Sequence, residues 1–339
     1  HDFGYIIDLL REATLDPLVT RIRITLYRVA KESRIVAALV NAARNGKRVM
    51  VVIEIQARFD EQVNIQAGDR LQEAGCKIIF GVPGLKVHTK MLLITRRVGE
   101  KTVRYAHIGT GNFHERNAKV YTDLALITAN QSIGKEVKKV FEMTEKNYMR
   151  PVYKHLLVSP INSRRRLEAM LQNEVNNAKE GKEAWIKLKL NNLVDNKMIK
   201  RLYKASEAGV KIQLIVRGVC ALVPGIPGYS ENIEVVSIVG RYLEHARILM
   251  FCNAGKTLYY LTSADIMTRN LDYRIEVGVP IYDAEVQQSL ARVFDLQWSD
   301  NVNARLIDKG LNNFYRTALP GEASMNSQEE FYNLYKGQA

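Results

Sequence analysis

Two histidines carry the strongest chemical signal in the sequence. His88 and His245 each follow a loop rich in glycine and proline and open an apolar strand, and each precedes a cation by two positions, Lys90 or Arg247. Alternation along a strand places each cation on the same face as its histidine. A lone histidine at a strand edge is more often structural than catalytic, but equivalent positions in a repeat reverse that preference. One neutral imidazole could attack phosphorus while its partner handles a proton or a negative oxygen.

Fixed positive charge accompanies the histidines. Phosphoryl transfer spreads negative charge over several oxygens, and the planar guanidinium binds phosphate through two hydrogen bonds. Arg28 and Arg58 follow the first two predicted strands, and Arg217 ends the equivalent strand of the C-terminal half. Ligands of open α/β sheets collect at such strand ends. Tyr121 could stack on a base or donate to a phosphate, so these side chains are candidate nucleotide or phosphate ligands.

Other phosphate-binding signals are weak. The turn GTGNF (109–113) could bring backbone N–H groups close to an anion, but its counterpart LTSAD (261–265) lacks the glycines. The sequence contains no GxxxxGK[ST] motif and no kinase catalytic-loop pattern. Any nucleotide chemistry would therefore be of another kind.

The elements that must position these residues occur twice. Residues 22–58 read as strand, helix and strand, with Ser33 as the predicted N-cap and Gly46 as the helix stop. Residues 186–217 repeat this order, with Asn196 as the candidate cap and Gly209 as the stop. Each half therefore reads as one α/β domain.

Two longer motifs extend the repeat. The first aligns VHTKMLLI (87–94) with EHARILMF (244–251). The second aligns NFHERNAKVYTDLAL (112–126) with DIMTRNLDYRIEVGV (265–279). In the second pair Asn117 falls on Asn270 and Asp123 on Glu276. If the halves pack about a pseudo-dyad, His88 and His245 face each other across one cleft.

The boundary between the halves is predicted near Leu156–Arg164, where turn residues and a basic run follow the predicted helix Ile133–Met149. We expect one domain over residues 1–155, a second over 156–316, and a polar, weakly ordered tail over 317–339.

Composition narrows the class of protein. The 339 residues are 47% hydrophobic and 25% charged, an ordinary globular balance that excludes a wholly disordered chain, and no apolar run is long enough for a transmembrane helix. The net charge of +13 favours an anionic partner such as nucleic acid, anionic lipid or a phosphate-rich molecule. The cysteines Cys76, Cys220 and Cys252 fit buried thiols in a reducing compartment, the cytoplasm. Because the chain opens at His1 without a methionine, we expect a fragment of a longer protein.

The paired His-x-Lys and His-x-Arg motifs resemble the phospholipase D superfamily. In that family an aspartate follows the lysine by five positions, whereas this sequence has Thr95 and Cys252 there. The departure counts against phosphodiester chemistry.

The sequence is more similar to the bacterial polyphosphate kinases of the histidine-phosphorylating type. The similarity runs from about Tyr27 to Asn312 and is carried by LYRVAKESRIV, VVIEIQARFDE, GLKVHTKM, YAHIGTGNF, VYTDLAL, LKLNNLVD, YLEHARI, SADIMTRNLDYRIEV and IDKGLNN. It implies an α/β fold of two tandem, duplicated phospholipase D-like domains, each a mixed sheet flanked by helices. It covers only the two C-terminal catalytic domains, so the N-terminal and head domains are expected elsewhere in the full protein.

The resemblance also implies residue roles. It makes His88 the phosphohistidine nucleophile, and it places Tyr121, Arg217 and His245 at ATP-contacting positions, with Lys90 and Arg247 as further candidate nucleotide ligands. Arg28 and Arg58 match positions associated with a magnesium–phosphate site. A guanidinium has no lone pair for Mg²⁺, so we expect these two to hold phosphate oxygens around the metal.

The implied reaction is reversible transfer of the ATP γ-phosphate to the end of a polyphosphate chain. The partners are then Mg²⁺, ATP or ADP, and polyphosphate, with a homo-oligomer in the full-length form and no nucleic acid. The expected location is the cytoplasm, peripheral to the inner membrane in one version of this hypothesis.

Two alternatives stay open. One is a phospholipase D-like phosphodiesterase that uses the same two histidines on lipid or nucleic acid. The other is a non-catalytic fragment that binds polyanions through charge alone. The first would act on a diester without nucleotide, and the second would tolerate His88→Ala.

Overall fold

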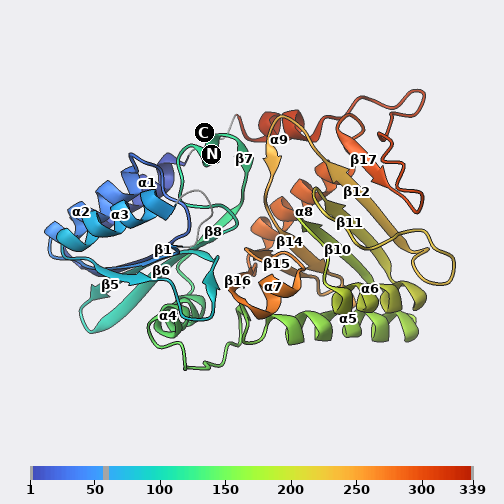
Figure 1. Ribbon diagram of the computed structural model, residues 1–339. Helices are drawn as coiled ribbons and strands as arrows, with labels where there is room; N and C mark the ends of the chain where they lie inside the picture. The colour runs from blue at the N-terminus through green and yellow to red at the C-terminus, as the bar shows by residue number, and fades with distance from the viewer. Residues whose placement is uncertain (1–2, 56–60, 337–339) are drawn as a thin grey trace. The chain divides into compact units, whose positions relative to one another are not determined.

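A computed structural model describes residues 3–55 and 61–336 of the chain (Figure 1). The chain folds into two compact units. Unit 1 comprises His1–Asn162 and Asp272–Val279, and unit 2 comprises Ser163–Leu271 and Pro280–Ala339. The chain therefore passes between units at Asn162–Ser163, and a strand from the C-terminal half belongs to unit 1.

Unit 1 is built on a six-stranded mixed sheet in the order β3-β2-β1-β5-β6-β8. β1, β2 and β3 run parallel, and β5, β6 and β8 add antiparallel strands. Figure 1 shows α1, α2 and α3 on one face of this sheet and α4 on the other. The elements are α1 (Gly4–Leu15), β1 (Val19–Leu26), α2 (Arg34–Arg44), β2 (Arg48–Ile53), α3 (Glu61–Glu73), β3 (Lys77–Phe80), β5 (Lys90–Val98), β6 (Lys101–Gly109), β8 (Ala125–Thr128) and α4 (Gln131–Glu145).

Short segments complete unit 1 around His88. β16 (Arg274–Pro280) pairs in parallel with β4 (Lys86–Val87) and antiparallel with β9 (Leu157–Ser159). The 3₁₀ turn η1 (Asn117–Lys119) and β7 (Tyr121–Thr122) lie between β6 and β8 in the chain. The β4–β16 pairing places Glu276 next to the histidine loop.

Unit 2 repeats the arrangement. Its sheet has the order β17-β12-β11-β10-β14-β15, with β10, β11 and β12 parallel and β14, β15 and β17 antiparallel. The order β12-β11-β10-β14-β15 matches β3-β2-β1-β5-β6 of unit 1, as duplication predicts. The elements are α5 (Ser163–Lys179), β10 (Trp185–Leu190), α6 (Asn196–Glu207), β11 (Lys211–Val216), β12 (Ile233–Ile238), β13 (Leu243–Glu244), β14 (Ile248–Phe251), β15 (Leu258–Thr262), α7 (Thr268–Asp272), α8 (Ala284–Trp298), β17 (Ala304–Ile307) and α9 (Ser327–Tyr335).

Local sequence signals explain the helix ends. The Ser33 hydroxyl caps α2 by accepting from the Val36 N–H, and Gly46 follows that helix at φ 79°. Gly209 follows α6 at φ 89°, so both predicted stops are confirmed. The predicted cap Asn196 is wrong by one residue, because the Asp195 carboxylate accepts from the Met198 N–H and Asn196 begins the helix.

The basic run at the predicted boundary forms the first turn of α5, where Arg164 pairs with Asp195. Within the tail that the sequence predicts to be weakly ordered, α9 forms with Asn326 as its N-cap. The side chains of Ser327 and Gln328 at the start of α9 are buried.

The three thiols are free, and Cys76 and Cys252 are buried as predicted, whereas Cys220 is only partly buried. Burial raises the pKa of each thiol, that of Cys76 to about 11. Within residues 3–55 and 61–336, the helices are too short or too polar to span a bilayer.

Candidate active site

The backbone around His88 is held on two sides. His88 lies between β4 and β5, and its N–H and that of Thr89 each donate to the Ile275 carbonyl of β16 at 3.0 Å. The Glu54 carboxylate, just after β2, accepts from the Val87 N–H at 2.8 Å. These bonds fix the path of the chain on either side of the imidazole.

The His88 imidazole faces a buried carboxylate. Its Nδ1 lies 2.9 Å from Oε1 and 3.0 Å from Oε2 of Glu276, and the side chains are 12% and 1% exposed. A carboxylate at Nδ1 favours the tautomer with the proton on that nitrogen, which leaves the lone pair on Nε2. The arrangement therefore fixes the orientation of the His88 ring.

Glu276 was not among the residues predicted for the site. The sequence carried a usable signal, because Glu276 aligns with Asp123 at an acidic position in both halves. Its pairing with a histidine 188 positions earlier depends on β16 joining β4, which is a tertiary event.

Cations surround the aromatic neighbour of His88. The Tyr27 ring meets the imidazole edge to face, with centroids 4.9 Å apart. Lys90 Nζ lies 5.2 Å from that ring, Lys86 Nζ 5.8 Å and the Arg28 guanidinium carbon 6.0 Å. Lys90 also donates to the His88 carbonyl oxygen. Positive charge therefore accumulates beside His88, where it could stabilise an anion.

The glycine turn before Tyr121 encloses a carboxylate. The Thr110 hydroxyl donates to Asp123 at 2.6 Å. A Cβ on Gly111 would lie 2.4 Å from Asp123 Oδ2, so only glycine fits there. In this structure the GTGNF turn therefore packs on Asp123, and Tyr121 begins β7 two residues before it.

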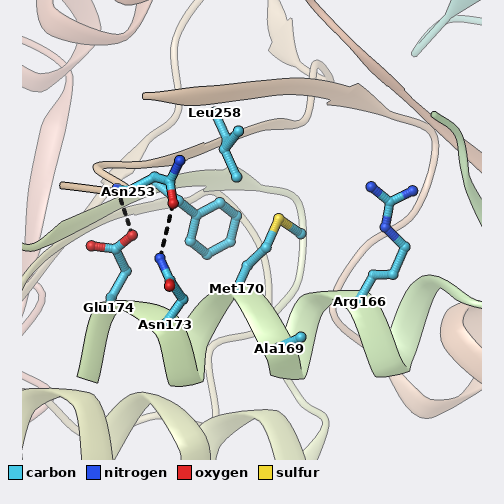
Figure 2. A pocket seen from close by; sticks show the side chains of 8 residues that line it. Arg166, Ala169, Met170, Asn173, Glu174, Asn253 and Leu258 are labelled. Carbon is cyan, nitrogen blue, oxygen red and sulfur yellow. Dashed lines mark hydrogen bonds between the residues drawn. The ribbon is translucent and has the colours of Figure 1, made fainter. Parts of the chain in front are cut away.

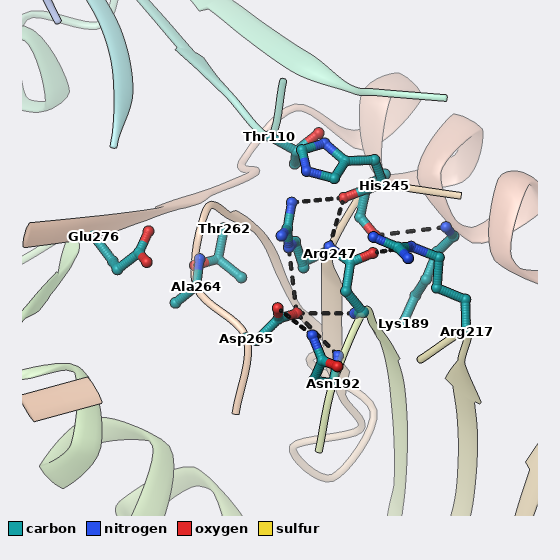
Figure 3. A network of polar contacts seen from close by, with 12 residues as sticks. Thr110, Lys189, Asn192, Arg217, His245, Arg247, Thr262, Ala264, Asp265 and Glu276 are labelled. Atoms are coloured by element: carbon teal, nitrogen blue, oxygen red, sulfur yellow. Dashed lines mark hydrogen bonds and ion pairs between the residues drawn. The ribbon is translucent and has the colours of Figure 1, made fainter. Parts of the chain in front are cut away.

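In unit 2 hydrogen bonds to the carbonyl oxygen of His245 hold its backbone in place. Arg247 Nη1 donates to the His245 carbonyl oxygen at 2.7 Å (Figure 3). Lys90 donates in the same way to the carbonyl oxygen of His88. Asn191 Nδ2 approaches the same oxygen at 3.4 Å, and the Arg217 Nε donates to Asn191 Oδ1 at 2.7 Å. Arg217 and His245 are thus linked through one asparagine.

Asp265 is the acidic centre of this network (Figure 3). It pairs with Arg247 at 3.3 Å and accepts from the Asn191 N–H at 2.8 Å and from Asn192 Nδ2 at 3.1 Å. Burial by itself raises the pKa of Asp265, but the Arg247 charge and these hydrogen bonds bring it below the ordinary value. The carboxylate therefore stays ionised and fixes Arg247.

The predicted site residues fall into two groups. Unit 1 holds His88, Lys90, Arg28 and Tyr121, and unit 2 holds His245, Arg247 and Arg217. Arg58 lies outside the described residues. The meeting of the two histidines across one cleft stays a prediction.

Direct metal ligation has little support in either unit. Within the described part of the chain, no group of three or more His, Cys, Asp or Glu side chains could hold a metal ion.

A separate pocket lies against α5 in unit 2 (Figure 2). Its volume is about 240 Å³, and it contains none of the predicted site residues. The Glu174 carboxylate at its edge accepts from the Asn253 N–H at 2.7 Å, and burial raises the pKa of Glu174. This pocket stays outside the candidate active site.

Sequence comparison matches both halves to known domains. Residues 1–150 match "Polyphosphate kinase C-terminal domain 1" and residues 156–328 match "Polyphosphate kinase C-terminal domain 2". A polyphosphate kinase of Vibrio parahaemolyticus is 52% identical over 336 residues, which are 99% of this chain and 48% of that protein. The Escherichia coli K12 polyphosphate kinase is 51% identical over 315 residues, 93% of this chain and 46% of that protein. The chain spans about half the length of the curated relatives it matches.

Structure comparison gives the same result. The polyphosphate kinase of Porphyromonas gingivalis superposes with a TM-score of 0.93 at 40% identity, over 100% of this chain and 52% of that one. A phosphatidylserine synthase of Haemophilus influenzae shares the fold at a TM-score of 0.59 and 14% identity, over 99% of this chain and 91% of that one. The predicted α/β fold of two tandem phospholipase D-like domains is confirmed, and the chain belongs to the polyphosphate kinase family.

Proposed function

We propose that this chain is the catalytic region of an enzyme that reversibly moves a terminal phosphate between ATP and polyphosphate through a phosphohistidine at His88. The observation that carries the proposal is the contact of His88 Nδ1 with the buried Glu276 carboxylate, at 2.9 Å. That contact leaves Nε2 as the nucleophilic nitrogen. Family membership supports the substrates.

The reaction has two displacements at phosphorus. In the first, the Nε2 lone pair forms an N–P bond to the γ-phosphorus, and the bond to the β–γ bridging oxygen breaks with its electron pair leaving on ADP. In the second, a terminal oxygen of polyphosphate attacks the same phosphorus, and the N–P electron pair returns to Nε2. Throughout, the Glu276 carboxylate accepts a hydrogen bond from the protonated Nδ1 and stabilises the positive charge that develops on the ring.

The cations serve the leaving group and the chain. Arg28 and Arg58 would hold phosphate oxygens, and Mg²⁺ would arrive bound to ATP as part of the substrate. Tyr121, Arg217 and His245 would contact the nucleotide. Lys90 and Arg247 are largely buried, 2% and 4% exposed, and each donates to a histidine carbonyl. Their positive charge then acts on the phosphates from behind the histidines.

The remaining partners belong to this proposal as well. Because the chain spans about half of its relatives, we propose that other domains of the full-length protein complete the nucleotide site and its oligomeric contacts. We also propose that the protein is located in the cytoplasm, with peripheral contact to the inner membrane. Nucleic acid is not a proposed partner.

The decisive experiment is phosphohistidine labelling of the full-length protein. The protein is incubated with γ-labelled Mg·ATP, and acid-labile, alkali-stable label is measured before and after a chase with polyphosphate. We expect label on the wild type that passes into polyphosphate, and no label on His88→Ala. His155→Ala, a histidine outside the proposed site, should label like the wild type.

Two results would overturn this function. Label that survives in His88→Ala would assign the nucleophile elsewhere. Absence of label in every form, together with hydrolysis of a phosphodiester without nucleotide, would favour the phospholipase D-like alternative.

A further inference from the structure

A buried polar cluster lies directly before His245 in unit 2. Lys189 Nζ is 2.9 Å from Glu244 Oε2, and both side chains are 2% exposed. Gln297 Nε2 donates to the same oxygen at 2.7 Å, and Gln328 Nε2 donates to Glu244 Oε1 at 2.8 Å. Buried charges are stable only where such partners surround them. The cluster therefore depends on residues from β10, β13, α8 and α9.

Gln328 contributes more than one bond to the approach to His245. Its Oε1 accepts from the Tyr242 N–H at 3.0 Å, and its Nε2 donates to the Tyr242 carbonyl at 2.9 Å. With the bond to Glu244, a single amide holds the backbone of the residue before β13 and the Glu244 side chain within it, both within three residues of the histidine. Removing it would leave buried donors and acceptors without partners.

The amide is placed there by the start of α9. The Ser327 N–H and hydroxyl donate to Asp300 Oδ2 at 2.8 and 2.6 Å, and Asn301 Oδ1 accepts from the Met325 N–H at 2.7 Å. Asp300 is 0% exposed and Gln328 is 9% exposed. The C-terminal segment is thus anchored immediately beside Gln328.

Gly240 leaves room for this contact. A Cβ at that position would lie 2.7 Å from Gln328 Oε1. The backbone φ of Gly240 is not in the left-handed region, and the three atoms nearest to an added Cβ all belong to the Gln328 amide. Gly240→Ala would therefore displace that amide.

We propose that α9 serves the active site and that Gln328 is a positioning residue, which holds β13 so that His245 is correctly oriented. This deepens the function proposed above and rests on it. A displacement of about 1 Å in a positioning element can lower a rate by up to about 100-fold. We expect a smaller loss, because Lys189 and Gln297 also hold Glu244.

The test is a double-mutant cycle in the full-length protein. Single-turnover labelling by γ-labelled Mg·ATP is compared for Gln328→Met, His245→Ala and the double variant. We expect Gln328→Met to slow labelling about 10-fold in the wild type and less than about 2-fold in His245→Ala, because the amide acts through that histidine. Glu329→Met, on the exposed side of α9, is the matched control and should leave the rate unchanged.

Gly240→Ala gives a second, independent readout. It should reproduce the loss seen in Gln328→Met, with the same attenuation in the His245→Ala background. Equal slowing by Gln328→Met in both backgrounds would show general destabilisation and overturn the proposal. So would a rate for Gln328→Met and Gly240→Ala equal to that of the control.

The experiment distinguishes failure of this proposal from failure of the proposed function. If His88→Ala keeps its label, the phosphohistidine assignment fails whatever Gln328 does. If His88→Ala loses its label but His245→Ala labels at the wild-type rate, only the role of His245, and with it that of Gln328, is overturned.

Discussion

At the scale of single residues, the proposed chemistry depends on one carboxylate. The contact between His88 Nδ1 and Glu276 favours the tautomer with the proton on Nδ1, which leaves the lone pair on Nε2. Lys90 fixes the same residue through its carbonyl group, so side chain and backbone are both restrained.

The first prediction concerns this pair. Glu276→Gln keeps the size of the side chain but removes its charge, so it should slow labelling of His88 about 10- to 100-fold. The rate is measured in a single turnover with γ-labelled Mg·ATP. Glu285→Gln, an exposed glutamate of α8, is the control. An unchanged rate in Glu276→Gln would show that the carboxylate does not activate the histidine.

The second prediction concerns His107 in β6. Burial lowers its pKa to about 4, so the folded protein keeps the ring neutral while the unfolded chain takes up a proton near pH 6.5. Stability should therefore fall as the pH drops from 6.5 to 4, by up to about 3 kcal/mol. His107→Phe should remove this part of the pH dependence of the urea midpoint. If wild type and variant lose stability in parallel, His107 is not responsible.

At the scale of elements, charged caps connect helices to the sheets. Asp195 caps α6, and both of its oxygens accept from Arg164 of α5, at 3.0 and 2.7 Å. The Thr268 hydroxyl, at the start of α7, adds a bond of 2.7 Å. These contacts, with Arg164 first, hold the pKa of Asp195 well below its ordinary value. One carboxylate thus joins three helices of unit 2.

The third prediction follows from this junction. Asp195→Asn keeps a capping oxygen but leaves Arg164 without its carboxylate, so unfolding at pH 7 should become easier by about 3 kcal/mol. The lowered pKa means that this stabilisation is present above pH 4 and is lost as the pH falls toward the folded-state value. Urea midpoints should therefore differ equally at pH 7 and 5. Asp283→Asn, at the exposed cap of α8, should change little, and an equal effect of both variants would contradict the prediction.

At the scale of the whole molecule, the two main features are the duplicated fold and the net positive charge. Each unit has its own mixed sheet and its own histidine between a two-residue strand and a longer one, which is β5 in unit 1 and the four-residue β14 in unit 2. The net charge of +13 gives the chain a field that attracts anions. Charge alone does not distinguish binding from catalysis.

The last prediction separates attraction from catalysis. Polyphosphate affinity of the full-length protein should fall steeply as salt rises from about 50 to 200 mM, because bound counterions are released on association. Binding is measured by competition with a labelled chain, and His88→Ala should show the same salt slope as the wild type. An affinity that does not respond to salt would contradict electrostatic capture.

The sequence by itself determined the local and repetitive features. It was sufficient for the two α/β halves, the helix stops Gly46 and Gly209, and both histidines with their following cations, because these depend on periodicity, backbone sterics and spacing within short segments. Long motifs also identified the family. The cap of α6 was displaced by one residue, since either Asp195 or Asn196 can fill that position chemically.

Only the tertiary structure decided which distant groups meet. Glu276 reaches His88 because β16 pairs with β4 in unit 1, and no local pattern encodes that pairing. Gln328 reaches Glu244 because the tail folds back as α9, although its polar composition predicted weak order. In both cases the partner is chosen by burial, since a buried charge or amide is stable only beside a group distant in sequence that completes its hydrogen bonds.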